Sequence, residues 1–143
     1  MKVVLDTNVV VDHICAKDVS CSAAVNAVRC HRHFLLVCNR LLKEYRGVLC
    51  KGDQQMYAVI DKLLLQMFPI ELMQKYDDPR VRIEFGPLED RFHMQLAIDA
   101  GANYHVTKDA AVLAEATKMQ RFNVRETHPR RYVDDCTRPT SKR

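Results

Sequence analysis

The sequence predicts an α/β domain in which a parallel sheet is covered by helices on both faces. Short, continuous apolar runs alternate along the chain with segments of helical periodicity, and strands in βαβ units have this appearance because both of their faces are buried. The chain has 143 residues, 48% hydrophobic and 28% charged, which is typical of a single globular domain. We therefore place one domain over residues 1–136 and a basic tail over 137–143.

The first half of the chain alternates apolar runs with helical segments. Val3–Leu5 and Phe34–Val37 are the apolar runs, and each predicts a buried strand. Helices are expected from about Asn8, over Ser20–Arg32 and from Asn39 to about Cys50.

The clearest helix is expected over Met56–Met67, where apolar residues recur at i, i+3, i+4, i+7, i+8 and i+11. Gly52 separates it from the preceding helix, and Pro69 ends it. Residues 70–88 are ambiguous, although Val81–Phe85 alternates and is compatible with an extended segment. The remaining expected elements are a helix over Glu89–Ala100 closed by Gly101, a strand over Tyr104–Thr107, a helix over Ala110–Met119 and a strand over Phe122–Val124.

Composition narrows the class of protein further. The sequence has no apolar stretch long enough for a membrane span and no signal peptide, so we expect a cytoplasmic protein without membrane association. Its six cysteines form no Cys-x-x-Cys pair and are expected to be free thiols. Residues 118–143 carry a net charge of +5 against −1 for the rest of the chain. That basic end suits a polyanionic partner, and it also suits a solvated tail.

Four acidic residues lie at the ends of the expected strands or on the expected helices, where they can form a site. Asp6 follows the first strand, and Asp109 follows the strand at Tyr104–Thr107. Right-handed crossovers bring the carboxyl ends of such strands to the same rim, where functional groups gather. Glu44 lies on the flank of the apolar arc of its helix, from which it can reach a cleft. Asp90 lies in the first turn of a helix, where the helix dipole favours an acid whatever the function.

Several blocks of sequence follow the order of the motifs of a known family. Asp6-Thr7-Asn8 follows an N-terminal apolar strand, and Glu44 stands in Leu41-Leu42-Lys43-Glu44-Tyr45. These blocks resemble the start and the second acid of the PIN-domain nucleases, most closely of the compact VapC-type toxins of prokaryotes. Residues 89–109 resemble the third and fourth blocks, in which an Asp starts a helix and Thr-x-Asp ends the next strand. Residues 123–133 resemble the last strand and closing helix, so the resemblance covers nearly the whole chain.

The resemblance implies a three-layer α/β/α sandwich and a metal-dependent endoribonuclease that leaves 5′-phosphate and 3′-hydroxyl ends. It implies a site for Mg²⁺ or Mn²⁺ made by Asp6, Glu44, Asp90 and Asp109. Crowded carboxylates repel one another, and a hard divalent cation relieves that repulsion while activating water for hydrolysis. Asn8 and Thr107 are then expected to orient the carboxylates.

The biological setting that this resemblance favours is the toxin of a toxin–antitoxin pair, with RNA as substrate and an antitoxin protein as partner. An RNA-processing nuclease without an antitoxin is an alternative, as is a catalytically silent RNA-binding or scaffold module. Relatives often use helices near Met56–Met67 in dimers, so part of that stripe is a candidate homodimer surface, with a fully core-facing stripe as the default.

Three further residues are candidates for substrate binding: Arg91, His93 and Lys108. His93 lies at i+3 from Asp90 and shares its helix face. Lys108 stands where many relatives have a small residue. It can contact a substrate phosphate, which we favour, or pair with an acid of the site, or remain solvated.

Overall fold

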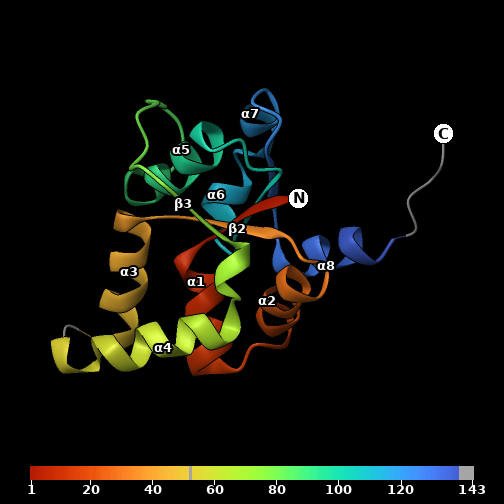
Figure 1. Cartoon of the computed structure of the whole chain (residues 1–143). Helices are drawn as coiled ribbons and strands as arrows, with labels where there is room; N and C mark the ends of the chain where they lie inside the picture. Colours follow the sequence, from red (N-terminus) through yellow and green to blue (C-terminus); the bar gives the residue numbers. More distant parts are fainter. Residues whose placement is uncertain (52, 139–143) are drawn as a thin grey trace.

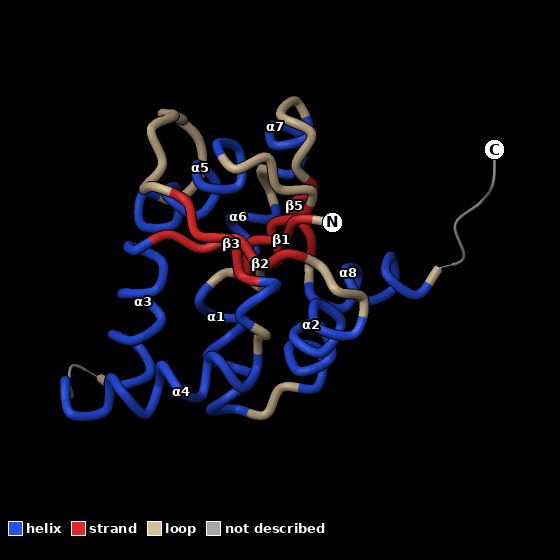
Figure 2. The backbone as a smooth tube through the Cα atoms, viewed as in Figure 1, coloured by secondary structure: helices blue, strands red, loops and turns tan. Residues whose placement is uncertain are grey.

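A computed structural model describes residues 1–51 and 53–138, which form a five-stranded sheet between two layers of helices (Figures 1 and 2). The strand order is β3-β2-β1-β4-β5, and every neighbouring pair is parallel. The predicted α/β class is therefore confirmed. The strands are β1 (Lys2–Leu5), β2 (Phe34–Cys38), β3 (Met73–Tyr76), β4 (Tyr104–Val106) and β5 (Arg125–Thr127).

Helices α1 to α4 and α8 cover one face of the sheet, and α5, α6 and α7 cover the other (Figure 1). The helices on the first face are α1 (Thr7–Val11), α2 (Val19–Cys30), α3 (Asn39–Cys50), α4 (Tyr57–Met67) and α8 (Pro129–Thr137). Those on the second are α5 (Arg91–Asp99), α6 (Ala110–Leu113) and α7 (Ala116–Gln120). Short helical turns add η1 (Asp12–Ala16, a π-helix), η2 (Gln54–Met56), η3 (Ile70–Leu72) and η4 (Leu88–Asp90).

The two strands β1 and β2 carry continuous apolar runs because helices cover both of their faces. Val3, Val4 and Leu5 of β1 are completely buried, as are Leu35 and Leu36 of β2. Successive side chains of a strand point to opposite faces, so only a sheet between two helical layers can bury such a continuous run. The apolar runs in the sequence thus correctly predicted that these strands are buried on both faces.

The apolar stripe over Met56–Met67, which spans the end of η2 and all of α4, is only partly in the core. Ile60, Leu64 and Met67 are buried, whereas Met56 and Val59 are exposed. The default of a fully core-facing stripe is therefore wrong for its outer part. Gly52, expected to separate α3 from α4, lies outside the described residues.

The other differences from the expected elements lie at the sheet edges and in one helix. β3 falls within the ambiguous residues 70–88, while 81–85 forms no strand. The last strand starts at Arg125, because Asn123 adopts a left-handed backbone with φ of 61° that ends the preceding turn. The single helix expected over Ala110–Met119 divides into α6 and α7.

The topology fixes where a site can form. β1 lies between β2 and β4, so the chain leaves β1 toward one edge of the sheet and returns to β4 on its other side. Ligands in open parallel sheets bind outside the carboxyl ends of the strands at such a reversal. The backbone N–H of Asp6 donates to the carbonyl of Val106 at 2.9 Å, which places the ends of β1 and β4 side by side.

Two expectations from composition can be compared with the structure. In the part of the chain that the structure describes, no helix has both the length and the hydrophobicity to cross a bilayer. All six cysteines belong to that part, and each is a free thiol.

Candidate active site

Asp6 is the centre of the acidic cluster at the ends of β1 and β4. It is 3% exposed, and the Thr107 hydroxyl donates to its Oδ2 at 2.6 Å. The Asn8 amide lies 3.5 Å from the same oxygen, and the Asn8 Oδ1 accepts from the Lys108 backbone N–H at 3.3 Å. Asn8 and Thr107 therefore hold the Asp6 carboxylate in one orientation and join the two loops around it.

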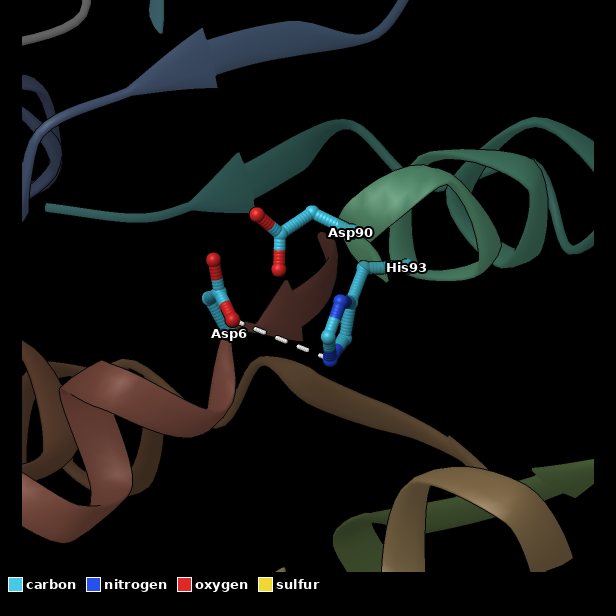
Figure 3. Close-up of side chains that lie close together, drawn as sticks. All are labelled: Asp6, Asp90 and His93. Atoms are coloured by element: carbon cyan, nitrogen blue, oxygen red, sulfur yellow. Dashed lines mark ion pairs between the residues drawn. The ribbon is translucent and has the colours of Figure 1, made fainter. Parts of the chain in front are cut away.

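Asp90 faces this cluster from the junction of η4 and α5. It occupies the N-cap position of α5 without making a side-chain cap hydrogen bond, and its carboxyl lies beside Asp6 (Figure 3). Burial raises the pKa of Asp90 to about 6, with the Asp6 and Asp109 carboxyls adding to this and His93 opposing it. Its neighbour Glu89 is exposed. The structure thus favours a role in the cluster over a helix cap for Asp90.

Asp109 reaches the cluster from the start of α6. Its Oδ1 accepts the backbone N–H of Ala111 at 2.8 Å, which caps the helix. Its backbone N–H donates to the Thr107 hydroxyl at 3.1 Å. Because its carboxyl also raises the pKa of Asp90, Asp109 lies in the group of acids as well as at a helix end.

Glu44 joins the cluster through His93. The Thr7 hydroxyl donates to Glu44 Oε2 at 2.7 Å, and His93 Nε2 lies 2.7 Å from the same oxygen. Burial acts to raise the pKa of Glu44, but hydrogen bonds from His93 and Thr7 and the charges of His93 and Arg40 lower it overall. His93 Nε2 is also 3.7 Å from Asp6 Oδ1 (Figure 3).

The donor set suits a divalent cation. Donor atoms of Asp6, Asp90 and His93 all lie within 4.8 Å of one another, with Glu44 and Asp109 adjoining them. Carboxylate oxygens are the ligands that hard divalent cations prefer. The raised pKa of Asp90 is the mark of like charges gathered with little solvent, and a cation bound among them would relieve that repulsion.

The basic residues expected to bind substrate have partners within the protein. Lys108 Nζ lies 2.7 Å from Asp12 Oδ2 and 3.0 Å from Asp18 Oδ2, and these contacts raise the pKa of Lys108. Arg91 is half-buried and its Nε donates to the carbonyl of Gly86 at 3.0 Å. The ammonium of Lys108 thus stands outside the cluster of four acids.

Asp12 and Asp18, with Cys21, form a second group of possible metal ligands. The Lys108 ammonium lies between the two carboxylates, and Asp18 also caps α2 through the backbone N–H of Cys21 at 3.0 Å. The ammonium offsets one of the two negative charges and lies where a metal ion would have to bind, so this group is a structural ion cluster.

Sequence reasoning missed three polar residues near the site. Thr7, part of the opening triplet, orients Glu44. His105, completely buried in β4, lies with its Nδ1 2.7 Å from Glu126 Oε2 on β5. Burial lowers the pKa of His105, but the charge and hydrogen bond of Glu126 outweigh it and raise the pKa overall. A histidine inside an apolar strand was the available signal, since a buried polar group needs a partner.

A family model described as "PIN domain" matches residues 2–111, a span that contains all four acids. Searches among curated proteins and among solved structures gave no match.

Proposed function

The chain belongs to the PIN domain family, whose members are generally metal-dependent nucleases, and we propose that it is an endoribonuclease that uses Mg²⁺ or Mn²⁺. The observation that carries this proposal is the convergence of Asp6, Glu44, Asp90 and Asp109 where β1 and β4 end. These four carboxylates would hold the cation, directly or through water.

A bound divalent cation would lower the pKa of a water molecule and offset the charge on the phosphate. The contribution of the chain is to fix its carboxylates before the substrate arrives. Thr107 and Asn8 fix Asp6, and Thr7 fixes Glu44. Asp90 loses its proton at a pH of about 6, so the full charge of the cluster is present only above that pH.

A basic side chain beside the cluster supports an anionic substrate. Arg40, exposed at the start of α3, is close enough to Glu44 to lower the pKa of that acid, and its guanidinium lies 4.2 Å from the centre of the Phe92 ring. A guanidinium stacked on an aromatic ring is suited to contact phosphates or bases. Arg40 is therefore a substrate-binding candidate in addition to Arg91. Lys108 is paired and His93 is fully buried.

The setting we favour is a cytoplasmic toxin restrained by an antitoxin. Met56 just before α4, Val59 on α4 and Val48 on α3 expose apolar surface that supports a homodimer or an antitoxin contact. An RNA-processing role without an antitoxin is the second candidate, and a catalytically silent RNA-binding or scaffold module is the third. Retention of all four acids at the cluster favours a catalytic protein over a silent one.

Cleavage of structured and unstructured RNA in Mg²⁺, Mn²⁺ or EDTA tests the activity. We expect cleavage with either metal and none in EDTA, and a loss of roughly 100-fold or more in Asp6→Asn and Glu44→Gln, since removing even supporting groups of a metal site costs 10–100-fold. Asp77→Asn and Glu71→Gln, at exposed positions, are the matched controls and should cleave normally. Full activity in both site variants, or cleavage in EDTA, would refute the proposal.

A further inference from the structure

The imidazole of His93 is a nitrogen donor placed among carboxylate oxygens. Its ring is completely buried, stacked on Phe92 with ring centres 4.1 Å apart, and so cannot lie at a substrate-binding edge. Its Nε2 is directed at the acids, 2.7 Å from Glu44 Oε2 and 3.7 Å from Asp6 Oδ1 (Figure 3). Because the ring is buried and packed within the fold, its Nε2 is held in this orientation toward the oxygen atoms.

These spacings would allow the donor atoms to bind one ion. Two ligand atoms bound at right angles to one ion at about 2.1 Å are roughly 3 Å apart. The distances from His93 Nε2 to the two oxygens lie on either side of that value. Asp90 also contributes an oxygen within 4.8 Å of the donor atoms of Asp6 and His93.

We propose that His93 Nε2 is a direct ligand of the divalent cation, beside Asp6 and Asp90, and that it makes the site select Mn²⁺ over Mg²⁺. The inference rests on the proposed metal-dependent function. Mg²⁺ favours an all-oxygen set, whereas transition metals accept imidazole, and Mn²⁺ is the hardest of them and tolerates both donor types.

The second nitrogen of His93 is the one that would carry the proton of a metal-bound ring. A ligating imidazole is neutral and carries its proton on the nitrogen that faces away from the metal. Among the described residues, the buried side-chain polar atoms without a hydrogen-bond partner are His93 Nδ1 and His105 Nε2. The two rings are neighbours, with centres 6.0 Å apart and planes inclined by 16°.

His93 Nε2 donates to Glu44 Oε2 at 2.7 Å, so this nitrogen carries the ring proton. A cation bound at Nε2 would take the place of that proton. The neutral ring would then carry its proton on Nδ1, which has no other hydrogen-bond partner among the described residues.

The experiment measures metal binding without RNA. Calorimetric titration of metal-free protein with MnCl₂ and with MgCl₂ gives the ratio of the two dissociation constants for wild type, for His93→Gln and for His31→Asn, an exposed histidine that serves as control. We expect His93→Gln to weaken Mn²⁺ binding by roughly 10–100-fold and Mg²⁺ binding much less, so that the selectivity falls at least about tenfold. His31→Asn should leave both constants unchanged.

A spectroscopic measurement on the wild type tests the ligand assignment without relying on a correctly folded variant. Electron spin echo modulation of the Mn²⁺-loaded protein should show a directly bound ¹⁴N nucleus, replaced by ¹⁵N when the histidines are isotopically labelled. Mn²⁺ binding without histidine coupling, or an unchanged selectivity in His93→Gln, overturns the ligand assignment alone. Absence of any Mn²⁺ or Mg²⁺ binding overturns the metal-dependent function with it.

Discussion

Replacing Asp90 with Asn should stabilise the metal-free protein even though it destroys activity. The Asp90 carboxyl is half-buried beside Asp6 and Asp109, and its pKa is about 6 instead of 3.8. At pH 7.5 the folded chain therefore holds an ionised carboxylate in a place that disfavours its charge. Asn keeps the size of the side chain and removes the charge.

The size of the effect follows from the pKa shift. Each pKa unit corresponds to about 1.4 kcal/mol, so the full shift is worth about 3 kcal/mol. Solvent screens a half-exposed group, which reduces the expected gain in unfolding free energy to about 1–2 kcal/mol. For a chain of this size, that gain raises the melting temperature by roughly 3–6 °C.

The pH dependence distinguishes this cause from a general packing effect. Because the pKa of Asp90 is raised in the folded state, its stabilising contribution is complete below pH 3.8 and is lost as the pH rises through about 6. The variant lacks that loss, so its advantage over wild type should be near zero at pH 4 and largest above pH 7.

Thermal melts in EDTA from pH 4 to 8, for wild type, Asp90→Asn and the exposed control Asp77→Asn, provide the assay. Saturating Mn²⁺ should then stabilise wild type more than Asp90→Asn, because the variant has lost a carboxylate ligand. A variant that melts at or below wild type in EDTA at pH 7.5, or an advantage that does not change with pH, would show that the acids of the cluster do not repel one another as argued.

Three further predictions concern buried or paired polar residues of the fold. Burial lowers the pKa of His33 to about 4, so the unfolding free energy should fall by up to about 3 kcal/mol as the pH falls from 6.5 to 4. Urea unfolding of His33→Gln should lack this loss. If the unfolding free energies of variant and wild type fall equally over this pH range, His33 is not the cause. Tyr45→Phe removes the hydroxyl that donates to the Leu5 carbonyl at 2.5 Å and should cost about 1–2 kcal/mol in urea unfolding, whereas no cost would mean that water replaces it. Lys108→Met should lower the melting temperature and leave the salt dependence of RNA binding unchanged; a shallower salt slope would instead assign Lys108 to the substrate.

The parts of this arrangement that the sequence predicted are those set by topology. Asp6 follows an apolar run and Asp109 follows the strand expected at Tyr104–Thr107, and parallel strands bring such positions to one rim, as the structure has them. The side of the helix on which Glu44 lies was readable from periodicity. Asp90 stayed ambiguous in sequence because a helix dipole and a metal site both favour an acid in a first turn.

The sequence could not predict features that depend on contacts between distant segments. β3 is an edge strand with half-buried residues, so it carries no continuous apolar run. The pairing of Lys108 with Asp12 and Asp18 joins residues about 90 positions apart. His93 likewise meets Glu44 only because α5 and α3 approach the same end of β1. Neither contact leaves a local pattern.

The position of Lys108 explains how a cation can stand between two residues of an acidic site without neutralising it. The Thr107 hydroxyl donates to Asp6, and the Asp109 carboxyl lies near Asp90, whereas Lys108 reaches Asp12 and Asp18. Side chains alternate along an extended segment, so the residue between two that face the cluster is directed away from it.

As a consequence, the negative charge of the four acids is not neutralised by a lysine or arginine among the described residues and can be neutralised by a bound cation. Among the described residues, neither lysine nor arginine forms an ion pair with Asp6, Glu44, Asp90 or Asp109, and the imidazole of His93 is their basic contact. Four carboxylates with one imidazole retain a net negative charge whichever way that imidazole is protonated. A structural ion cluster has a cation of the protein between its acids, as Lys108 lies between Asp12 and Asp18. The cluster at the ends of β1 and β4 has no such lysine or arginine among the described residues, and Thr7 and Thr107 hold its carboxylates in place. It is arranged to receive a cation from solution.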